Sequence, residues 1–293
     1  MLDAKRRSRP EGTPARAGIT SSGSSLRIGR VALTVRDLDR VSRFYQDIVG
    51  LKLINSDAQG HRLGTGSTVL LELRHDPQAP LADRHQAGLF HTAFLVPDRA
   101  ALADWVIHAV DRRAALDGAS DHLVSEALYL TDPEGNGIEI YHDRPSEEWT
   151  ITPDGSVAMA TLPLDLNELA ATRSGRPFEG MRDDTIVGHV HLQVGELDAA
   201  EDFWSGRMGM GLMTRYPGAH FFGADGYHHH IGANIWNSRG AGPRPEGTTG
   251  LAEVELLATP EAAADIAGRM GVAPAETLDA RDPWGTRLTI RTA

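Results

Sequence analysis

The stretch Ile28–Ile54, IGRVALTVRDLDRVSRFYQDIVGLKLI, decides the fold, because a second copy lies 159 residues further along at Val187–Met213, VGHVHLQVGELDAAEDFWSGRMGMGLM. Each copy begins with apolar residues at every second position, and this period predicts a half-buried strand. Asp37 then stands where a helix N-cap is expected. A short amphipathic helix and a second strand follow in both copies.

Two further pairs of segments repeat and complete the pattern. Gly88–Val106, GLFHTAFLVPDRAALADWV, matches Gly250–Gly268, GLAEVELLATPEAAADIAG. Thr131–Tyr141, TDPEGNGIEIY, matches Arg281–Arg291, RDPWGTRLTIR, and its Asp-Pro-x-Gly turn signal opens a last strand. The repeats predict an α+β fold of four modules, each a strand, a helix and three strands. The modules span approximately residues 28–76, 88–143, 187–237 and 250–291.

The tandem order of the modules predicts two domains. We expect modules one and two to form domain 26–145, and modules three and four to form domain 186–293. The segment 146–185 has mixed character and is interpreted as the linker. Residues 1–25 are rich in Arg, Ser, Gly and Pro and contain no apolar core segment, so they predict a disordered tail rather than a secretory signal.

Composition excludes several classes of function. The 40 acidic residues outnumber the 29 basic ones, giving a formal net charge of -11. This balance argues against a nucleic-acid partner and against an anionic membrane surface. No apolar run is long enough to span a bilayer, so we expect a cytoplasmic protein. Because Cys is absent, any metal must be held by His, Asp or Glu, and the 13 His make this feasible.

The repeat pattern resembles the vicinal oxygen chelate superfamily of glyoxalases, bleomycin resistance proteins and extradiol dioxygenases, and within it the four-module catechol-2,3-dioxygenase-like proteins. The segments that carry the resemblance are Gly88–Pro97, Gly118–Pro145 and Gly226–Trp236. The resemblance implies that each pair of modules forms a half-open barrel of strands. It also implies that the barrel cavity holds a divalent metal, which the substrate chelates through two adjacent oxygens.

The resemblance also places the metal-ligand positions, at the start of the first strand and the middle of the last strand of each module. In the first pair these positions are Arg30, Glu72, His91 and Glu139, and in the second pair they are His189, Asn234, Glu253 and Thr289.

We therefore expect metal ligands at His91, Glu139 and Glu72 in the first pair. A second set would use His189 and Glu253 with an imidazole from the run Tyr227-His228-His229-His230, for which we select His230. Two imidazoles and a carboxylate on one face, with open positions, suit Fe(II), and Mn(II), Zn(II) or Ni(II) accept the same ligand types.

Arg30 departs from this pattern, because a guanidinium cannot ligate a cation. It could form a salt bridge with Glu72, which would then have no ligand role, or it could bind an anionic substrate in the cavity. Extradiol enzymes also carry a His-x-x-Ser stretch and a Tyr before the Asp-Pro turn, here His122 and Tyr129. The resemblance implies that both contact substrate oxygens, and His75 is a further candidate for acid–base catalysis.

Three functions are compatible with these residues. The first is a metal-dependent dioxygenase or lyase that acts on a small catechol-like or α-keto-like substrate. The second is a non-catalytic protein that binds or sequesters a small molecule, as bleomycin-resistance-like relatives do, and Arg30 favours it. The third is a degenerate paralogue retained for stability or for assembly into a homo-oligomer.

Overall fold

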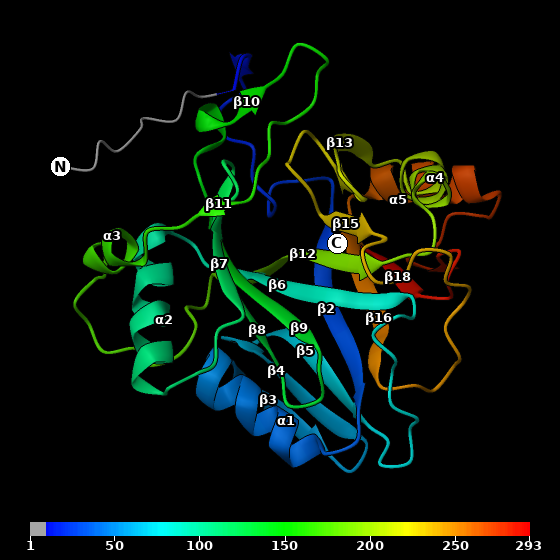
Figure 1. Cartoon of the computed structure of the whole chain (residues 1–293). Helices are drawn as coiled ribbons and strands as arrows, with labels where there is room; N and C mark the ends of the chain where they lie inside the picture. The colour runs from blue at the N-terminus through cyan, green and yellow to red at the C-terminus, as the bar shows by residue number, and fades with distance from the viewer. Residues whose placement is uncertain (1–9) are drawn as a thin grey trace.

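The structure is a computed structural model, and it describes residues 10–293. Two large mixed sheets dominate it, with a few helices on their outer sides (Figure 1). The predicted α+β fold of paired modules is confirmed, because the first strands of two modules lie side by side at the centre of each sheet. In the part of the chain that the structure describes, no helix is both long and apolar enough to cross a membrane.

The first sheet has nine strands. They are β6 (Gly88–Leu95), β7 (Gly118–Asp121), β8 (Ser125–Thr131), β9 (Gly137–Asp143), β11 (Leu162–Pro163), β12 (Ile186–Gln193), β13 (Gly211–Tyr216), β14 (Ala219–Gly223) and β15 (Ile231–Asn234). Their order is β11-β7-β8-β9-β6-β12-β15-β14-β13. The central strands β6 and β12 are antiparallel, while β9 runs parallel to β6 and β15 runs parallel to β12.

The second sheet has seven strands and the same central plan. They are β2 (Leu26–Val35), β3 (Lys52–Asp57), β4 (Gly60–Thr65), β5 (Thr68–His75), β16 (Gly250–Ala258), β17 (Thr277–Arg281) and β18 (Arg287–Thr292). Their order is β17-β18-β16-β2-β5-β4-β3. Here β2 and β16 are antiparallel, β5 runs parallel to β2, and β18 runs parallel to β16.

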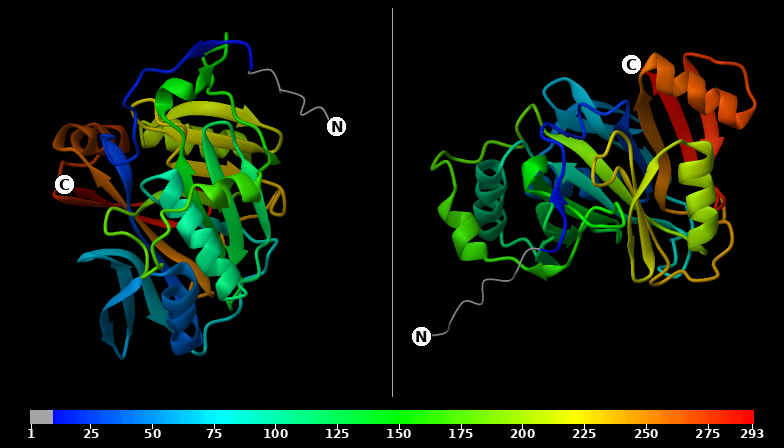
Figure 2. Two further views of the ribbon diagram at one scale, coloured as in Figure 1. Left: turned by 90° about the vertical axis from the view of Figure 1, so that its left-hand side faces the viewer. Right: turned by 90° about the horizontal axis from the view of Figure 1, so that it is seen from above.

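Helices follow the first strand of each module. Seen from above in Figure 2, α2 and α3 lie at one end of the molecule and α4 and α5 at the other, with strands between them. Asp37 is the predicted N-cap of the first helix, and its Oδ1 accepts a hydrogen bond from the backbone N–H of Arg40 at 3.1 Å. The α-helices are α1 (Leu38–Phe44), α2 (Arg99–Asp111), α3 (Leu166–Ala171), α4 (Leu197–Glu201) and α5 (Pro260–Met270). The π-helical turns η1 (Tyr45–Val49) and η3 (Asp202–Arg207) follow α1 and α4 directly, and η2 (Ser146–Glu148) is a 3-10 turn.

The pairing of the modules differs from the tandem expectation. Modules two and three share the first sheet, and modules one and four share the second. Charge explains this choice, because Arg30 on β2 forms ion pairs with Glu253 and Glu255 on β16. Opposite charges on neighbouring strands stabilise their pairing. Boundaries at 145 and 186 therefore do not separate the two sheets, and they stay a prediction as limits of independent folding.

The fourth module is shorter than predicted. Only β17 and β18 follow its helix, instead of three strands. The six residues 271–276 between Met270 and Thr277 include a Gly and a Pro, and they are too few for another strand with its two turns.

The segment before the first module is ordered from residue 10 onward. The short strand β1 (Thr13–Pro14) pairs with β10 (Thr150–Ile151), and the buried Ser21 donates a hydrogen bond to the Gly188 carbonyl at 3.3 Å. The expectation of a disordered tail is therefore wrong for 10–25, while residues 1–9 lie outside the described part. The Ser21 side chain thus finds a backbone partner in module three, which the composition of the segment does not reveal.

The expected linker is also part of the fold. Trp149 is buried, and its ring packs edge-on against that of Tyr227 in module three. Strand β11 extends the first sheet by pairing with β7. The two sheets share one apolar core, in which Val31 and Leu33 of β2 belong to the same cluster as Val190 of β12. This core holds the central strands rigidly and so positions the side chains on their other face.

Candidate metal centre

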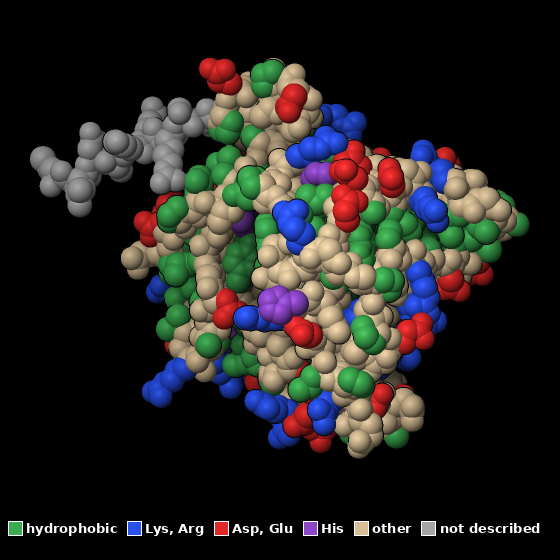
Figure 3. All heavy atoms as spheres, turned by 45° about the vertical axis from the view of Figure 1, so that its right-hand side comes forward, with side chains coloured by type: hydrophobic (Ala, Val, Ile, Leu, Met, Phe, Trp, Pro, Cys, Tyr) green, Lys and Arg blue, Asp and Glu red, His purple; other side chains and the backbone are tan. Residues whose placement is uncertain are grey.

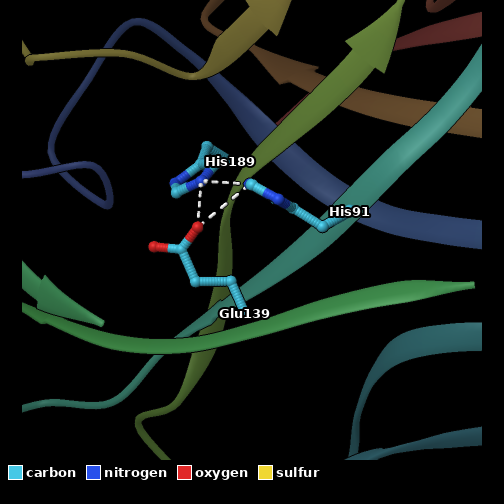
Figure 4. A group of neighbouring side chains, drawn as sticks. All are labelled: His91, Glu139 and His189. Atoms are coloured by element: carbon cyan, nitrogen blue, oxygen red, sulfur yellow. Dashed lines mark hydrogen bonds and ion pairs between the residues drawn. The ribbon is translucent and has the colours of Figure 1, made fainter. Parts of the chain in front are cut away.

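Three buried side chains converge from adjacent strands of the first sheet. His91 comes from β6, Glu139 from β9 and His189 from β12, and they point toward one another (Figure 4). Oε2 of Glu139 lies 3.0 Å from Nε2 of His91 and 3.3 Å from Nε2 of His189. The two Nε2 atoms are 3.3 Å apart, and all three ligand atoms lie within 4.8 Å of one another.

Strand register explains this convergence. Ala93 on β6 has Glu139 as its partner on one side and His189 on the other. His91 is two residues before Ala93, so it lies on the same face of the strand. The small alanine side chain leaves room above it, and the three larger side chains fill that space. The site thus follows from one alanine and its two neighbours in the sheet.

The electrostatics of the three residues suit a metal. Burial lowers the pKa of His189 to about 4, so its imidazole is neutral at neutral pH. Burial would raise the pKa of Glu139, but His189 and His91 outweigh it and hold this pKa well below its usual value. A metal ion requires deprotonated ligands, and these are an ionised carboxylate and a neutral imidazole.

The donor set also fits a divalent ion chemically. Within residues 10–293, the ion pairs of Glu139 are with His91 and His189 alone, so no Lys or Arg compensates this buried carboxylate. A buried carboxylate is costly unless it is paired or ligates a metal. Nδ1 of His189 is buried and has no hydrogen-bond partner in the described part of the chain. Two imidazoles and one carboxylate on one face leave open positions for a chelating substrate.

A hydrogen-bonded pair lies beside this centre. Tyr129 is the register partner of Glu139 on β8, and its hydroxyl lies 2.6 Å from Nε2 of His122. Nδ1 of His122 lies 2.6 Å from the carbonyl oxygen of Ala160, so in a neutral imidazole Nδ1–H donates there and Nε2 accepts from Tyr129. Burial and the Glu139 carboxylate raise the pKa of Tyr129 well above its usual value, so the hydroxyl keeps its proton.

All five of these residues line one cavity of about 630 Å³. Figure 3 shows this side of the molecule hollowed, with hydrophobic side chains along the hollow and charged and histidine side chains near its rim. Part of the cavity wall is aromatic, and it includes Phe90, Phe221 and Trp236.

Two further histidines of the cavity were not selected from the sequence. His191 is two residues after His189 on β12, opposite His91, and the His91 and His191 rings are 4.9 Å apart. The strand period applied to His189 would have identified it. The ring of His229 lies 4.1 Å from that of His189, and its Nδ1 is 2.8 Å from Nδ1 of His228. Burial lowers the pKa of both His191 and His229 well below the usual value, so both rings are neutral.

Three expected site residues lie in the other sheet. The structure does not bring Glu72 to His91 and Glu139, and it does not bring Glu253 to His189, with which a second metal site was expected. Both glutamates instead form ion pairs with Arg74, at 2.7 Å and 2.9 Å, and with Arg30. Arg30 does not line the cavity, so it does not lie where it was expected to bind substrate. Sheet pairing is the cause, since β2 and β5 form no part of the first sheet.

Two expected histidines also lie away from the centre. His75 is exposed at the end of β5, in the second sheet, so it does not face the cavity. His230 is buried, but its Nδ1 accepts a hydrogen bond from the backbone N–H of Ala224 at 3.2 Å, and it does not line the cavity. The period-two argument failed for this histidine run because β15 begins only at Ile231, after the run has ended.

Known proteins are similar to this chain in sequence. The Glyoxalase/Bleomycin resistance protein/Dioxygenase superfamily model matches residues 27–140 and 186–292. Catechol-2,3-dioxygenase of Bacillus subtilis (strain 168) is 39% identical over 237 residues, which cover 80% of this chain and 83% of that protein. Biphenyl-2,3-diol 1,2-dioxygenase 3 of Rhodococcus globerulus is 26% identical over 168 residues, which cover 52% of this chain and 84% of that protein.

Solved structures show the same fold. Glyoxalase I from Zea mays superposes with a TM-score of 0.55 at 16% identity, covering 93% of this chain and 94% of that one. A putative dioxygenase from Bacillus subtilis superposes with a TM-score of 0.58 at 16% identity, covering 92% and 85%. Since the family model covers both halves of the sequence and the Bacillus relative spans most of it, the chain belongs to the Glyoxalase/Bleomycin resistance protein/Dioxygenase superfamily.

Proposed function

We propose that this chain is a metal-dependent extradiol dioxygenase that cleaves the ring of a catechol-type substrate. The convergence of His91, Glu139 and His189 in a cavity, beside the His122–Tyr129 pair, carries this proposal. The similarity to the Bacillus catechol-2,3-dioxygenase supports it. We propose Fe(II) as the metal, because two imidazoles and one carboxylate with open positions suit non-haem iron. The partner is then a small molecule, and a cytoplasmic location stays a prediction.

The protein groups around the centre have distinct tasks. A bound divalent metal would supply Lewis acidity that favours ionisation of the substrate hydroxyls. The Tyr129 hydroxyl donates a hydrogen bond to Nε2 of His122, and its oxygen can accept one from a substrate hydroxyl. The pair can thus relay a proton from the substrate to the imidazole. The Ala160 carbonyl holds the His122 ring in place. Phe90 and Trp236 pack edge to face at 5.3 Å and limit access of water. Both atoms of O2 enter the ring-opened product, so the reaction needs no external reductant.

The sequestering alternative loses its main support. It depended on Arg30 as an anion ligand in the cavity, and the guanidinium instead pairs with Glu72, Glu253 and Glu255 elsewhere. A glyoxalase-type isomerisation would use the same metal ligands and is distinguished from ring cleavage by the product.

Tyr129→Phe tests the proposal. The protein is loaded with Fe(II) without oxygen, then given catechol in air, and O2 consumption and the ring-opened product are followed. We expect one iron per chain in both proteins and a fall in kcat of about 10²–10⁴-fold in the variant, typical of a lost proton-transfer group.

Tyr216→Phe is the matched control, because Tyr216 also lines the cavity but has no role in the mechanism. Its kcat should stay near that of the unsubstituted protein. Iron-loaded protein that consumes no O2 with catechol or substituted catechols, or that isomerises a hemithioacetal instead, would refute ring cleavage.

A further inference from the structure

The cavity wall contains a cation without a carboxylate partner. Arg244 lies in the loop between β15 and β16, is half-buried and lines the same cavity as the metal centre. Its guanidinium donates to the backbone carbonyl oxygens of Thr249, at 3.3 Å, and of Leu251. Among residues 10–293 it forms no ion pair with Asp or Glu.

Several other half-buried arginines differ from Arg244 in this respect. Arg30, Arg74 and Arg99 each form ion pairs with carboxylates. Burial lowers the pKa of Arg244, and the negative charge of Asp282 opposes this shift. The Asp282 carboxylate already accepts hydrogen bonds from the backbone N–H groups of Trp284 and Thr286. A partly desolvated cation is costly unless it is paired. A guanidinium has five N–H donors in a planar fork that matches a carboxylate, so most of its donors remain for a ligand.

Two glycines keep this guanidinium accessible. A side chain at Gly88 or at Gly250 would begin 3.3 Å from Nη1 of Arg244, and both glycines have positive φ. Gly88 is the first residue of β6, and His91 is three residues further along the same strand. A strand rises about 3.3 Å per residue, so the guanidinium lies about 10 Å along β6 from the metal ligands.

An aromatic surface lies between the Arg244 guanidinium and the metal ligands. Phe90 packs against His191 at 5.1 Å and against Trp236 at 5.3 Å, and all three line the cavity. Trp236 is 46% exposed, which places it at the cavity opening. The cavity volume of about 630 Å³ lies within the range of roughly 300–1,000 Å³ that holds drug-sized ligands, and a single catechol ring would leave much of it empty.

We propose that Arg244 is an anion subsite, and that the substrate is a catechol whose ring carries a substituent ending in a carboxylate. The two hydroxyls lie at His91, Glu139 and His189, and the carboxylate pairs with the Arg244 guanidinium about 10 Å away along β6. The substrate class rests on the proposed ring cleavage, whereas the anion subsite does not. Arg84, which is exposed and lines the same cavity, adds positive charge at the opening.

Titration calorimetry with 4-phenylbutyrate and 4-phenylbutanamide tests the subsite without any turnover. Neither probe has adjacent oxygens on a ring, so binding reports the aromatic surface and the far end of the cavity. We expect the full-length protein to bind the carboxylate at least about tenfold more tightly than the amide. Arg244→Gln should weaken carboxylate binding by about 10- to 100-fold, as expected for lost charge-assisted hydrogen bonds, and leave amide binding within about twofold.

Arg244→Lys separates charge from geometry, because it keeps the cation and loses the planar fork. It should retain part of the preference for the carboxylate. Equal weakening of both probes by Arg244→Gln would overturn the proposal, since it would mean that Arg244 only holds its loop through the two carbonyls. Equal affinity of the unsubstituted protein for both probes would overturn it as well.

Steady-state kinetics on the iron-loaded enzyme test the substrate class. The substrates are 4-(3,4-dihydroxyphenyl)butyrate and its methyl ester. Arg244→Gln should raise KM for the acid by about 10- to 100-fold, with kcat and the ester parameters unchanged. Carboxylate-selective binding without ring cleavage would retain the subsite and refute the dioxygenase. Ring cleavage with the same KM for acid and ester in both proteins would refute the subsite alone.

Discussion

The centres of the two sheets share one backbone plan and differ in chemistry. In the first sheet Ala93 has Glu139 as its neighbour on the parallel strand, and in the second sheet Ala32 has Glu72 in the corresponding place. Both carboxylates thus come from the last strand of a module and project over a small residue.

The remaining positions diverge. On the antiparallel side, Ala93 pairs with His189, whereas Ala32 pairs with Glu253. Two residues before each alanine, the first sheet has His91 and the second has Arg30. The imidazoles of His189 and His91 in the first sheet are therefore replaced in the second sheet by the carboxylate of Glu253 and the guanidinium of Arg30.

The difference shows two ways to compensate a carboxylate cluster. In the first sheet one carboxylate lies among imidazoles, and a bound metal would supply the missing positive charge. In the second sheet Glu72 and Glu253 are joined by Glu255, and the guanidinium groups of Arg30 and Arg74 compensate all three from within the protein. We infer that the second sheet uses a side-chain cation in the place of the metal.

The largest effect should come from removing the corresponding carboxylates one at a time. Glu139→Gln removes an anionic ligand, so we expect metal affinity to fall by about 100-fold or more, together with the activity. Glu72→Gln, its counterpart in the second sheet, should leave metal content unchanged. Elemental analysis of both variants after Fe(II) loading measures this. Similar metal loss in both would show that the two clusters are not functionally different.

Removal of the guanidinium should instead affect stability. Arg30→Met leaves Glu72, Glu253 and Glu255 with less compensation, and their side chains are only 12–16% exposed. We expect a loss of about 2–4 kcal/mol in the free energy of unfolding at pH 7, with metal content unchanged. Urea denaturation measures it. Arg62→Met is the control, because Arg62 is 54% exposed and only 3.9 Å from Glu72, and it should cost less than about 1 kcal/mol.

Acid should reduce the difference in unfolding free energy between the unsubstituted protein and Arg30→Met. Burial would raise the pKa of Glu72, but hydrogen bonding and charge from Arg74 and Arg30 lower it below the usual 4.5. A lowered folded-state pKa means that the stabilisation is present above about pH 4.5 and is lost as the pH falls below it. Without Arg30 this pKa rises, so Arg30→Met has less stabilisation to lose in acid. If the stability difference were the same at pH 7 and pH 4, the loss would come from packing rather than charge.

Residues within a module were predictable from the sequence, and contacts between modules were not. Alternation and the Asp-Pro turn located the first and last strands, and the resemblance to the superfamily then placed His91, Glu139 and His189 at ligand positions. His189 was assigned to a different site, because every module begins with the same alternating strand and this pattern does not specify its partner. Which strand pairs with which depends on charge pairs such as Arg30 and Glu253. Neither residue alone indicates its partner strand.

The fourth ligand position shows a second limit. Register makes Gly232, the partner of His191 on β15, the counterpart of Glu139, whereas the resemblance had placed this position at Asn234. A side chain at Gly232 would begin 2.9 Å from the His191 ring, so the imidazole fills the space that a ligand would need. The loop that precedes β15 is longer than a simple hairpin turn and shifts the register by two residues, which single-sequence alignment does not detect.

The smallest expected effect is also the most direct way to break the contrast between the sheets. Arg30→His places an imidazole at the counterpart of His91, and Arg74→Ser in the same chain releases Glu72 and Glu253 from their ion pairs with Arg74, leaving only the 3.9 Å contact of Glu72 with the exposed Arg62. One imidazole and two carboxylates can ligate a divalent ion, so the double variant should take up a second equivalent of metal. Binding should be weak, because the side chains around Glu72 and Glu253 are packed for ion pairs with guanidinium groups and not for a metal. We expect added Mn(II) to stabilise the variant by about 1–3 kcal/mol beyond its effect on the unsubstituted protein.

Metal titration followed by calorimetry measures the number of bound equivalents and the stabilisation by Mn(II). The control is Arg30→His/Arg74→Ser/Glu72→Gln, which should return to one equivalent. A single equivalent in the double variant would mean that more than the guanidinium groups keeps metal out of the second sheet.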